Sequence, residues 1–452
     1  MFFPQTWLIS DEYAYINQAI AIANGERHLQ FFDTILKEGL SYKYTNYPLG
    51  NAFYLSFWIK LFGKPYVFLG SLFSVLASYF MIVKTLKKLE YPVLAANLIF
   101  LYPALLFFSK TTMSGMVSLL IASLFLYLLI SWENSRSKFL SLAFLATLSF
   151  WIRETNLVLL GSATLVHYFT YRKGFWWYVL GAILGLLPRL ITAFIYYDDP
   201  FYFVFAESFQ LQALIHNIRE YLILLIIFMP GGLFLFYRYN GEYAKEIKWS
   251  AFSFILVYLF YSFNPTEYSG FKKGIILIGR FLLPLLPLFC VVAGAWLSKY
   301  KWNKTVKVSF VVLVSILIIF SSFIIHKEGE KHIKVTKQIN ENYLDSFVFY
   351  DHSTLTNIVR YINPLTSKID YHADLTKLLN HDYMYSVLEN HEDVVIINSL
   401  NIGNEEKLSR TAKIQDLIDQ LPSTYNLKRV EEIKVAPNLS IEVLRINLAE
   451  DE

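Results

Sequence analysis

Ten predominantly apolar stretches fill this chain between residues 66 and 325, and they constrain its fold more than any other feature. They cover residues 66–83, 92–108, 113–131, 138–152, 155–171, 175–197, 221–239, 249–263, 281–298 and 305–325. A helix needs about 20 apolar residues to cross a bilayer. Only helices and closed barrels satisfy their backbone groups in lipid. The sequence therefore predicts a mainly α, polytopic membrane protein with about ten spans.

The composition supports this class. The chain is 55% hydrophobic and 17% charged, whereas soluble domains carry about 25% charged residues. Its one cysteine, Cys290, lies in an apolar stretch, which excludes an intramolecular disulfide and a cysteine metal site.

Loop charges predict the orientation, because cytoplasmic loops are rich in Lys and Arg. One alternate set of loops is the richer throughout: Lys84, Lys87 and Lys88, then Arg136 and Lys138, Arg172 and Lys173, Arg238, Lys245 and Lys248, and Lys299, Lys301 and Lys304. The other set holds Lys110, Arg153, the acidic pair Asp198-Asp199, and Lys272 and Lys273. The richer set is predicted to be cytoplasmic, which places residues 1–65 and 326–452 outside the plasma membrane.

The outer segment 1–65 precedes the transmembrane domain 66–325. We expect a short helix to Gly25 and an amphipathic juxtamembrane helix from Tyr47 to Gly63. The segment 1–9 is too short to span, so nothing in 1–65 drives this region across the membrane. We therefore expect an upstream helix that this sequence lacks, and eleven spans in the full protein.

Residues 326–452 differ from the rest in charge. They carry 14 Lys and Arg against 21 Asp and Glu, whereas the remainder carries 26 against 15. Strands are predicted at 346–350, 393–397, 433–435 and 440–446, and helices at 355–362 and 414–421. This pattern predicts a small extracytoplasmic α/β domain, whose acidic balance gives no support for nucleic-acid binding.

Asp11 and Glu12 are the first candidate site. Spacing alone fits a helix cap, with Ser10 or Asp11 capping and Glu12 favourable at the positive end of the helix dipole. The functional interpretation makes one carboxylate a general base, or a ligand of a divalent metal.

Four basic residues at outer span ends form the second candidate site: Lys110, Arg153, Arg189 and Arg280. Charge at membrane depth is costly and usually functional or paired, and guanidinium groups match phosphate oxygens. Alternatively, Arg153 pairs with Glu154, and Arg280 and Lys110 reach the lipid headgroups. We interpret His216, in the aromatic loop 198–220, as structural.

Five motifs occur along the chain, and their order is more specific than any one of them. They are Asp11-Glu12-Tyr13-Ala14-Tyr15; Tyr47-Pro48-Leu49-Gly50 running to Lys60-Leu61-Phe62-Gly63; Trp151-Ile152-Arg153-Glu154-Thr155; Leu187-Pro188 followed by Asp198-Asp199-Pro200-Phe201; and Arg280-Phe281-Leu282-Leu283-Pro284 with Gly294. Together they resemble the GT-C glycosyltransferases, the polyprenyl-phosphate-sugar-dependent group that includes protein O-mannosyltransferases and lipid A aminoarabinose transferase.

The resemblance implies roles for the candidate residues. Asp11 would activate the acceptor or coordinate a metal such as Mg or Mn, and Arg153 and Arg280 would bind the donor phosphate. Many relatives place a second carboxylate where this chain has residues 109–116 without one. Glu12 or Glu154 would supply it, or the mechanism would be metal-free.

The sequence thus predicts an inverting glycosyltransferase that uses a polyprenyl-phosphate (dolichyl-phosphate-type) donor on the outer face of the membrane, with a glycan, protein or lipid as acceptor. The main alternative is a transporter or flippase of a lipid-linked or anionic substrate, although we find no internal repeat typical of transporters. A structural assembly protein that kept the fold without the chemistry is a further alternative.

Overall fold

The computed structural model describes residues 10–25, 48–131, 136–171, 175–197, 200, 210–229, 231–261, 271–300, 303–350, 372–401, 415–422, 424–436 and 439–448. These residues divide into two compact units. The helical unit contains the described residues of 18–324. The α/β unit contains those of 325–448 together with 10–17, so helix α1 (Ser10–Asn24) contributes to both.

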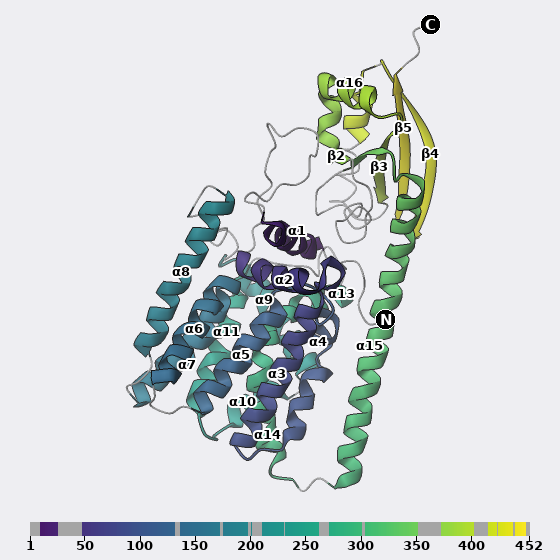
Figure 1. Ribbon diagram of the computed structural model, residues 1–452. Coiled ribbons are helices and arrows are strands. Elements are labelled where there is room, and N and C mark those ends of the chain that lie inside the picture. Colours follow the sequence, from purple (N-terminus) through teal and green to yellow (C-terminus); the bar gives the residue numbers. More distant parts are fainter. Residues whose placement is uncertain are drawn as a thin grey trace. The chain divides into compact units, whose positions relative to one another are not determined.

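Apolar helices build the helical unit (Figure 1). Its α-helices are α2 (Leu49–Phe62), α3 (Leu69–Lys88), α4 (Pro103–Phe108), α5 (Gly115–Ile130), α6 (Arg136–Ile152), α7 (Thr155–Tyr171), α8 (Phe175–Tyr197), α9 (Ala213–Phe228), α10 (Gly232–Arg238), α11 (Ala244–Leu259), α13 (Phe271–Gly279) and α14 (Leu286–Leu297). Among the described residues, three 3-10 helices join them: η1 (Lys64–Tyr66), η2 (Val93–Leu101) and η4 (Arg280–Leu285). Helix α2 lies across one end of the bundle (Figure 1).

Each predicted span contains helix, but several are not single straight helices. The stretch 92–108 forms η2 and α4, because Pro103 begins a new helix. The stretch 221–239 is divided between α9 and α10, which meet at 87° around Gly231, a residue with a left-handed backbone (φ 73°). Among the described residues, four helices are long and apolar enough to span, or five if the bent pair counts as one.

Helix α15 (Lys304–Asn342) does not end at residue 325 as the sequence predicted. Its 39 residues make a helix about 58 Å long at 1.5 Å per residue, far longer than a bilayer core. Residues up to 324 belong to the helical unit and are largely apolar and exposed, whereas its last turns belong to the α/β unit.

The α/β unit contains a five-stranded sheet of order β2-β1-β3-β5-β4, confirming the predicted α/β fold of this region. Its strands are β1 (Phe347–Tyr350), β2 (His372–Asp374), β3 (Val394–Asn401), β4 (Tyr425–Ala436) and β5 (Leu439–Leu448). Strand β1 pairs in parallel with β2 and β3, and β5 pairs antiparallel with β3 and β4. The predicted helix 355–362 lies outside the described residues.

Both faces of this sheet are covered, which explains why β1 is buried at every position. Val335 and Ile339 of α15 pack on the face that includes Val348. The other face, with Phe349, packs against 3-10 helix η6 (Leu375–Leu379) and α16 (His381–Asn390). Asn380 caps α16, its side chain accepting the Tyr383 amide at 3.1 Å.

Helices α6 and α8 pack closely because of a glycine. A Cβ added to Gly181 would lie 2.6 Å from the Ala143 Cα, and Thr147 Oγ1 donates to the Gly181 carbonyl at 2.9 Å. We expect Gly181→Ala to force the helices apart and to destabilise the protein by about 1–3 kcal/mol. Thermal unfolding in detergent measures this.

The matched control is Ile183→Ala on the same helix, where the side chain is exposed. This change should move stability by no more than about 0.5 kcal/mol. Equal melting temperatures for Gly181→Ala and the wild type would contradict the close packing of α6 and α8.

Candidate functional site

The first residues of α2 join two loops that carry candidate site residues. A Cβ on Gly50 would collide with the Trp151 carbonyl and lie 3.0 Å from the Ile152 amide nitrogen, so only glycine allows α2 to approach the end of α6. The next residue, Asn51, donates its side-chain amide to the Thr112 carbonyl at 3.0 Å. Gly50 and Asn51 together therefore position the α6–α7 junction and the loop 109–114.

Arg153 occupies the junction between α6 and α7. Its guanidinium lies 4.9 Å from the centroid of the Phe281 ring and 5.7 Å from that of Tyr258. The Tyr258 hydroxyl is fixed by Thr155 Oγ1 at 2.8 Å. Arg153 is partly exposed, and no carboxylate of the described residues forms an ion pair with it. Two aromatic rings thus orient a cation whose N–H groups remain available to an anion.

The alternative in which Arg153 pairs with Glu154 is wrong. Glu154 forms an ion pair with Arg189 of α8 instead, and both side chains are largely buried. Arg189 also lies over the Phe150 ring at 5.5 Å. Consecutive residues at a helix start point in different directions, which is why Glu154 reaches α8 and Arg153 does not. The Glu154 carboxylate offsets the charge that Arg189 offers to any other anion.

Arg280 begins the 3-10 helix η4 and is buried, with 6% of its surface exposed. Its guanidinium lies 4.9 Å from the Phe281 ring and 6.0 Å from that of Phe108. The alternative in which Arg280 reaches the headgroups is therefore wrong for this structure. Its backbone carbonyl lies 3.5 Å from where a Gly115 Cβ would be, so η4 packs against the start of α5.

Lys110 lies in the loop 109–114 between α4 and α5 and is buried, at 8% exposed. Thr111 and Thr112 in the same loop are fixed by side chains of Ser71 and Asn51, which donate to their carbonyls. Lys110 Nζ has no hydrogen-bond partner within the described part of the chain. Burial lowers the pKa of Lys110 to about 8. A buried amine without an acceptor is suited to bind an anion that the structure does not contain.

Asp11 and Glu12 lie in the first turn of α1, where the predicted helix begins. Glu12 is fully buried, whereas the Asp11 side chain is outside what the structure describes. Among the described residues no three His, Cys, Asp or Glu side chains gather as a metal site would need. Tyr47, Asp198, Asp199 and Glu207 also lie outside the described residues.

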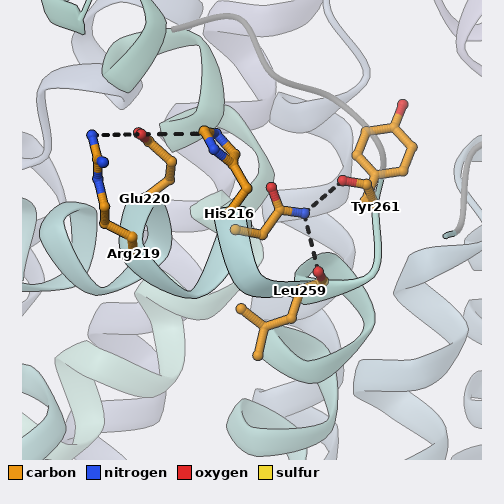
Figure 2. A network of polar contacts seen from close by, with 6 residues as sticks. His216, Arg219, Glu220, Leu259 and Tyr261 are labelled. Carbon is orange, nitrogen blue, oxygen red and sulfur yellow. Dashed lines mark hydrogen bonds and ion pairs between the residues drawn. The ribbon is translucent and has the colours of Figure 1, made fainter. Parts of the chain in front are cut away.

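Helix α9 supplies polar residues that the sequence interpretation missed. Asn217 donates its amide to the carbonyls of Leu259 and Tyr261, at 3.0 and 2.7 Å, and so closes the end of α11 (Figure 2). Glu220, on the same helix, lies between His216 and Arg219 (Figure 2). The sequence placed His216 in a surface loop, but it lies within the first turn of α9. The helical periodicity of residues 213–228 was the signal that could have identified this helix.

Comparisons with known proteins agree with the GT-C resemblance. Residues 279–359 match a model of the Alg9-like mannosyltransferase family. The fold matches the crystal structure of ArnT from Cupriavidus metallidurans in the apo state, with a TM-score of 0.60 and 13% identity over 97% of this chain and 93% of that one. A comparison with curated proteins found no match. The predicted membrane GT-C fold is confirmed, and the family match over residues 279–359 supports the prediction of a glycosyltransferase.

The buried amine of Lys110 should make the stability of the folded protein depend on pH. Its pKa of about 8 in the folded state lies below the ordinary value of 10.5. Folding below pH 8 therefore requires a buried charge, and this penalty is relieved as the pH rises from 8 to 10.5. We expect Lys110→Met to be more stable than the wild type at pH 7, by roughly 3 kcal/mol at most. The difference should narrow towards pH 10.

Thermal unfolding of both proteins between pH 6 and 10 measures this. The control is Lys84→Met, which removes an exposed lysine that lies 4.6 Å from the Phe80 ring and should show no such pH-dependent gain. A Lys110→Met protein that is less stable than the wild type at pH 7 would show that the amine is paired.

Proposed function

We propose that this GT-C glycosyltransferase moves a sugar from a polyprenyl-phosphate donor to an acceptor at the outer face of the membrane, with inversion of the anomeric centre. Lys110, Arg153 and Arg280 would bind the donor phosphate, and Asp11 or Glu12 would take the acceptor proton. Arg189 would contribute less, because Glu154 already offsets its charge.

One observation carries this proposal: the cations converge through shared contacts. Arg153 and Arg280 lie on the same ring, each 4.9 Å from the Phe281 centroid. Their guanidinium groups are therefore within about 10 Å of each other. Lys110 belongs to the loop that α2 ties to the Arg153 junction through Gly50 and Asn51. An anion of the size of a phosphate is the ligand that such a set favours.

The chemistry follows from charge. When the bond between sugar and phosphate breaks, negative charge grows on the departing lipid phosphate. Fixed cations in a site of low dielectric stabilise this charge more than water does, because they need no reorganisation. A carboxylate on the opposite side of the sugar would remove the acceptor proton, and attack from that side inverts the anomeric centre.

The membrane surroundings fit a lipid donor. Exposed apolar side chains cover much of α3, α8 and α15, so an isoprenoid chain can lie beside the unit while its phosphate meets the cations. The outer location rests on the Lys and Arg content of the loops. Asp11 is the residue that we propose as the ligand of Mg or Mn, where a divalent ion takes part.

We expect Asp11→Asn to lower kcat by about 10²- to 10⁴-fold, because an amide cannot accept the acceptor's proton. The measurement is transfer of labelled sugar from undecaprenyl-phosphate donors by the purified protein. The control is Glu242→Gln, an exposed carboxylate in the turn that precedes α11. Full activity of Asp11→Asn would exclude Asp11 as the base.

We expect Arg153→Gln to weaken binding of sugar-free undecaprenyl phosphate at least 10-fold, since a charge-assisted hydrogen bond to phosphate is lost. Arg238→Gln is the matched control, because Arg238 also lies over a ring, that of Phe234 at 5.6 Å, but belongs to a loop that the charge pattern predicts to be cytoplasmic. Binding by fluorescence titration distinguishes the two variants. Equal affinities for both would remove Arg153 from the phosphate site.

A further inference from the structure

Helix α9 carries a carboxylate on its inward face. Side chains on one stripe are buried: Asn217, Glu220, Tyr221, Leu224 and Leu225. Those on the opposite stripe are exposed and apolar: Ile215, Ile218, Leu222 and Ile226. The spacing of three and four residues shows that Glu220 points into the unit and not toward lipid. An ionisable group on the inward face of a membrane helix indicates a functional site.

The negative charge of Glu220 is only weakly offset by neighbouring groups. Its side chain is 2% exposed. One oxygen, Oε1, lies 3.9 Å from His216 Nε2 and 4.0 Å from Arg219 Nη2, too far for hydrogen bonds. The other oxygen, Oε2, is buried and has no hydrogen-bond partner within the described part of the chain. A buried carboxylate oxygen without a donor is costly, so a hydrogen-bond donor is what this position lacks.

Contacts connect Glu220 to the cation set. Its neighbour Tyr221 lies 6.4 Å from Tyr258, ring to ring, and Tyr258 is one of the rings beneath Arg153. Helix α9 also packs against α13, the helix that leads directly into Arg280. Helix α9, which carries Glu220, therefore contacts both the ring beneath Arg153 and the helix that precedes Arg280.

We propose that Glu220 binds the sugar of the donor, its Oε2 accepting a hydrogen bond from a sugar hydroxyl group. This inference rests on the proposed function. The sugar is bonded directly to the phosphate, so the group that recognises it must lie beside the cations that hold the phosphate. Arg219 already places a positive charge near Oε1, which makes a neutral hydroxyl a better partner for Oε2 than a further cation.

The test couples a change in the protein to a change in the donor. Undecaprenyl-phosphate donors bearing mannose or glucose, and their monodeoxy derivatives, are compared for transfer by the wild type and by Glu220→Leu. We expect the wild type to lose about 10- to 100-fold in kcat/KM on one particular deoxy donor. With the complete sugar, the kcat/KM of Glu220→Leu should be lower than that of the wild type by the same factor. On that deoxy donor the kcat/KM of the variant should fall no further.

Two further measurements separate binding of the sugar from a structural role. Glu220→Leu should bind sugar-free undecaprenyl phosphate as tightly as the wild type, and its melting temperature in detergent reports whether it folds. If Glu220→Leu does not fold, Glu220→Gln, which keeps the shape, replaces it in the same comparison. Ile226→Ala, which changes an exposed side chain on the opposite stripe of the same helix, is the control and should transfer sugar normally.

The outcomes are distinct. Deoxy donors that affect the variant and the wild type equally would overturn the role of Glu220 and leave the proposed function standing. Loss of undecaprenyl-phosphate binding in a folded variant would also overturn it, because Glu220 would then act on the phosphate side. A wild type that neither binds undecaprenyl phosphate nor transfers sugar would overturn the proposed function, and this inference with it.

Discussion

The cost of burying charge among apolar helices determines how the helical unit is arranged. Each ionised group there needs a partner, and the partners differ in kind. Glu154 and Arg189 neutralise each other between α7 and α8. Arg153 and Arg280 lie against aromatic rings, which stabilise a cation without removing its capacity to bind an anion. Lys110 Nζ and Glu220 Oε2 lack hydrogen-bond partners among the described residues. For this reason Lys110 and Glu220 are among the groups that we assign to substrate.

This arrangement depends on close backbone approach. Gly50 lets α2 lie on the end of α6, and Asn51 then reaches the loop that contains Lys110. Both contacts come from one short motif at the start of α2, so a single helix that lies across the bundle fixes two loops at once. A larger residue at position 50 would move both loops, which explains how a residue that never touches a substrate can matter to the site.

The α/β unit is held together by burial of apolar side chains on both faces of its sheet. Its strand β1 is buried on both faces because α15 covers one side of the sheet and α16 covers the other. Helix α15 is the longest element of the described chain, apolar and exposed at first and then packed on the sheet. Since a helix continues through a change of surroundings as long as its backbone bonds are made, the boundary predicted at residue 325 is not a break in the helix.

The class of the protein follows from local patterns in the sequence. Apolar stretches predicted the membrane helices, alternation of strands and helices predicted the α/β region, and the order of five motifs predicted the GT-C fold, which the comparison confirmed. These features are local, because each depends on residues close together in the chain. The sequence could not decide which charges meet. Arg153 and Glu154 are adjacent, yet Glu154 pairs with Arg189 on another helix, and the inward direction of Glu220 depends on where α9 packs. Only the tertiary structure decided these pairings, because the distance between two charges is set by packing and not by their separation along the chain.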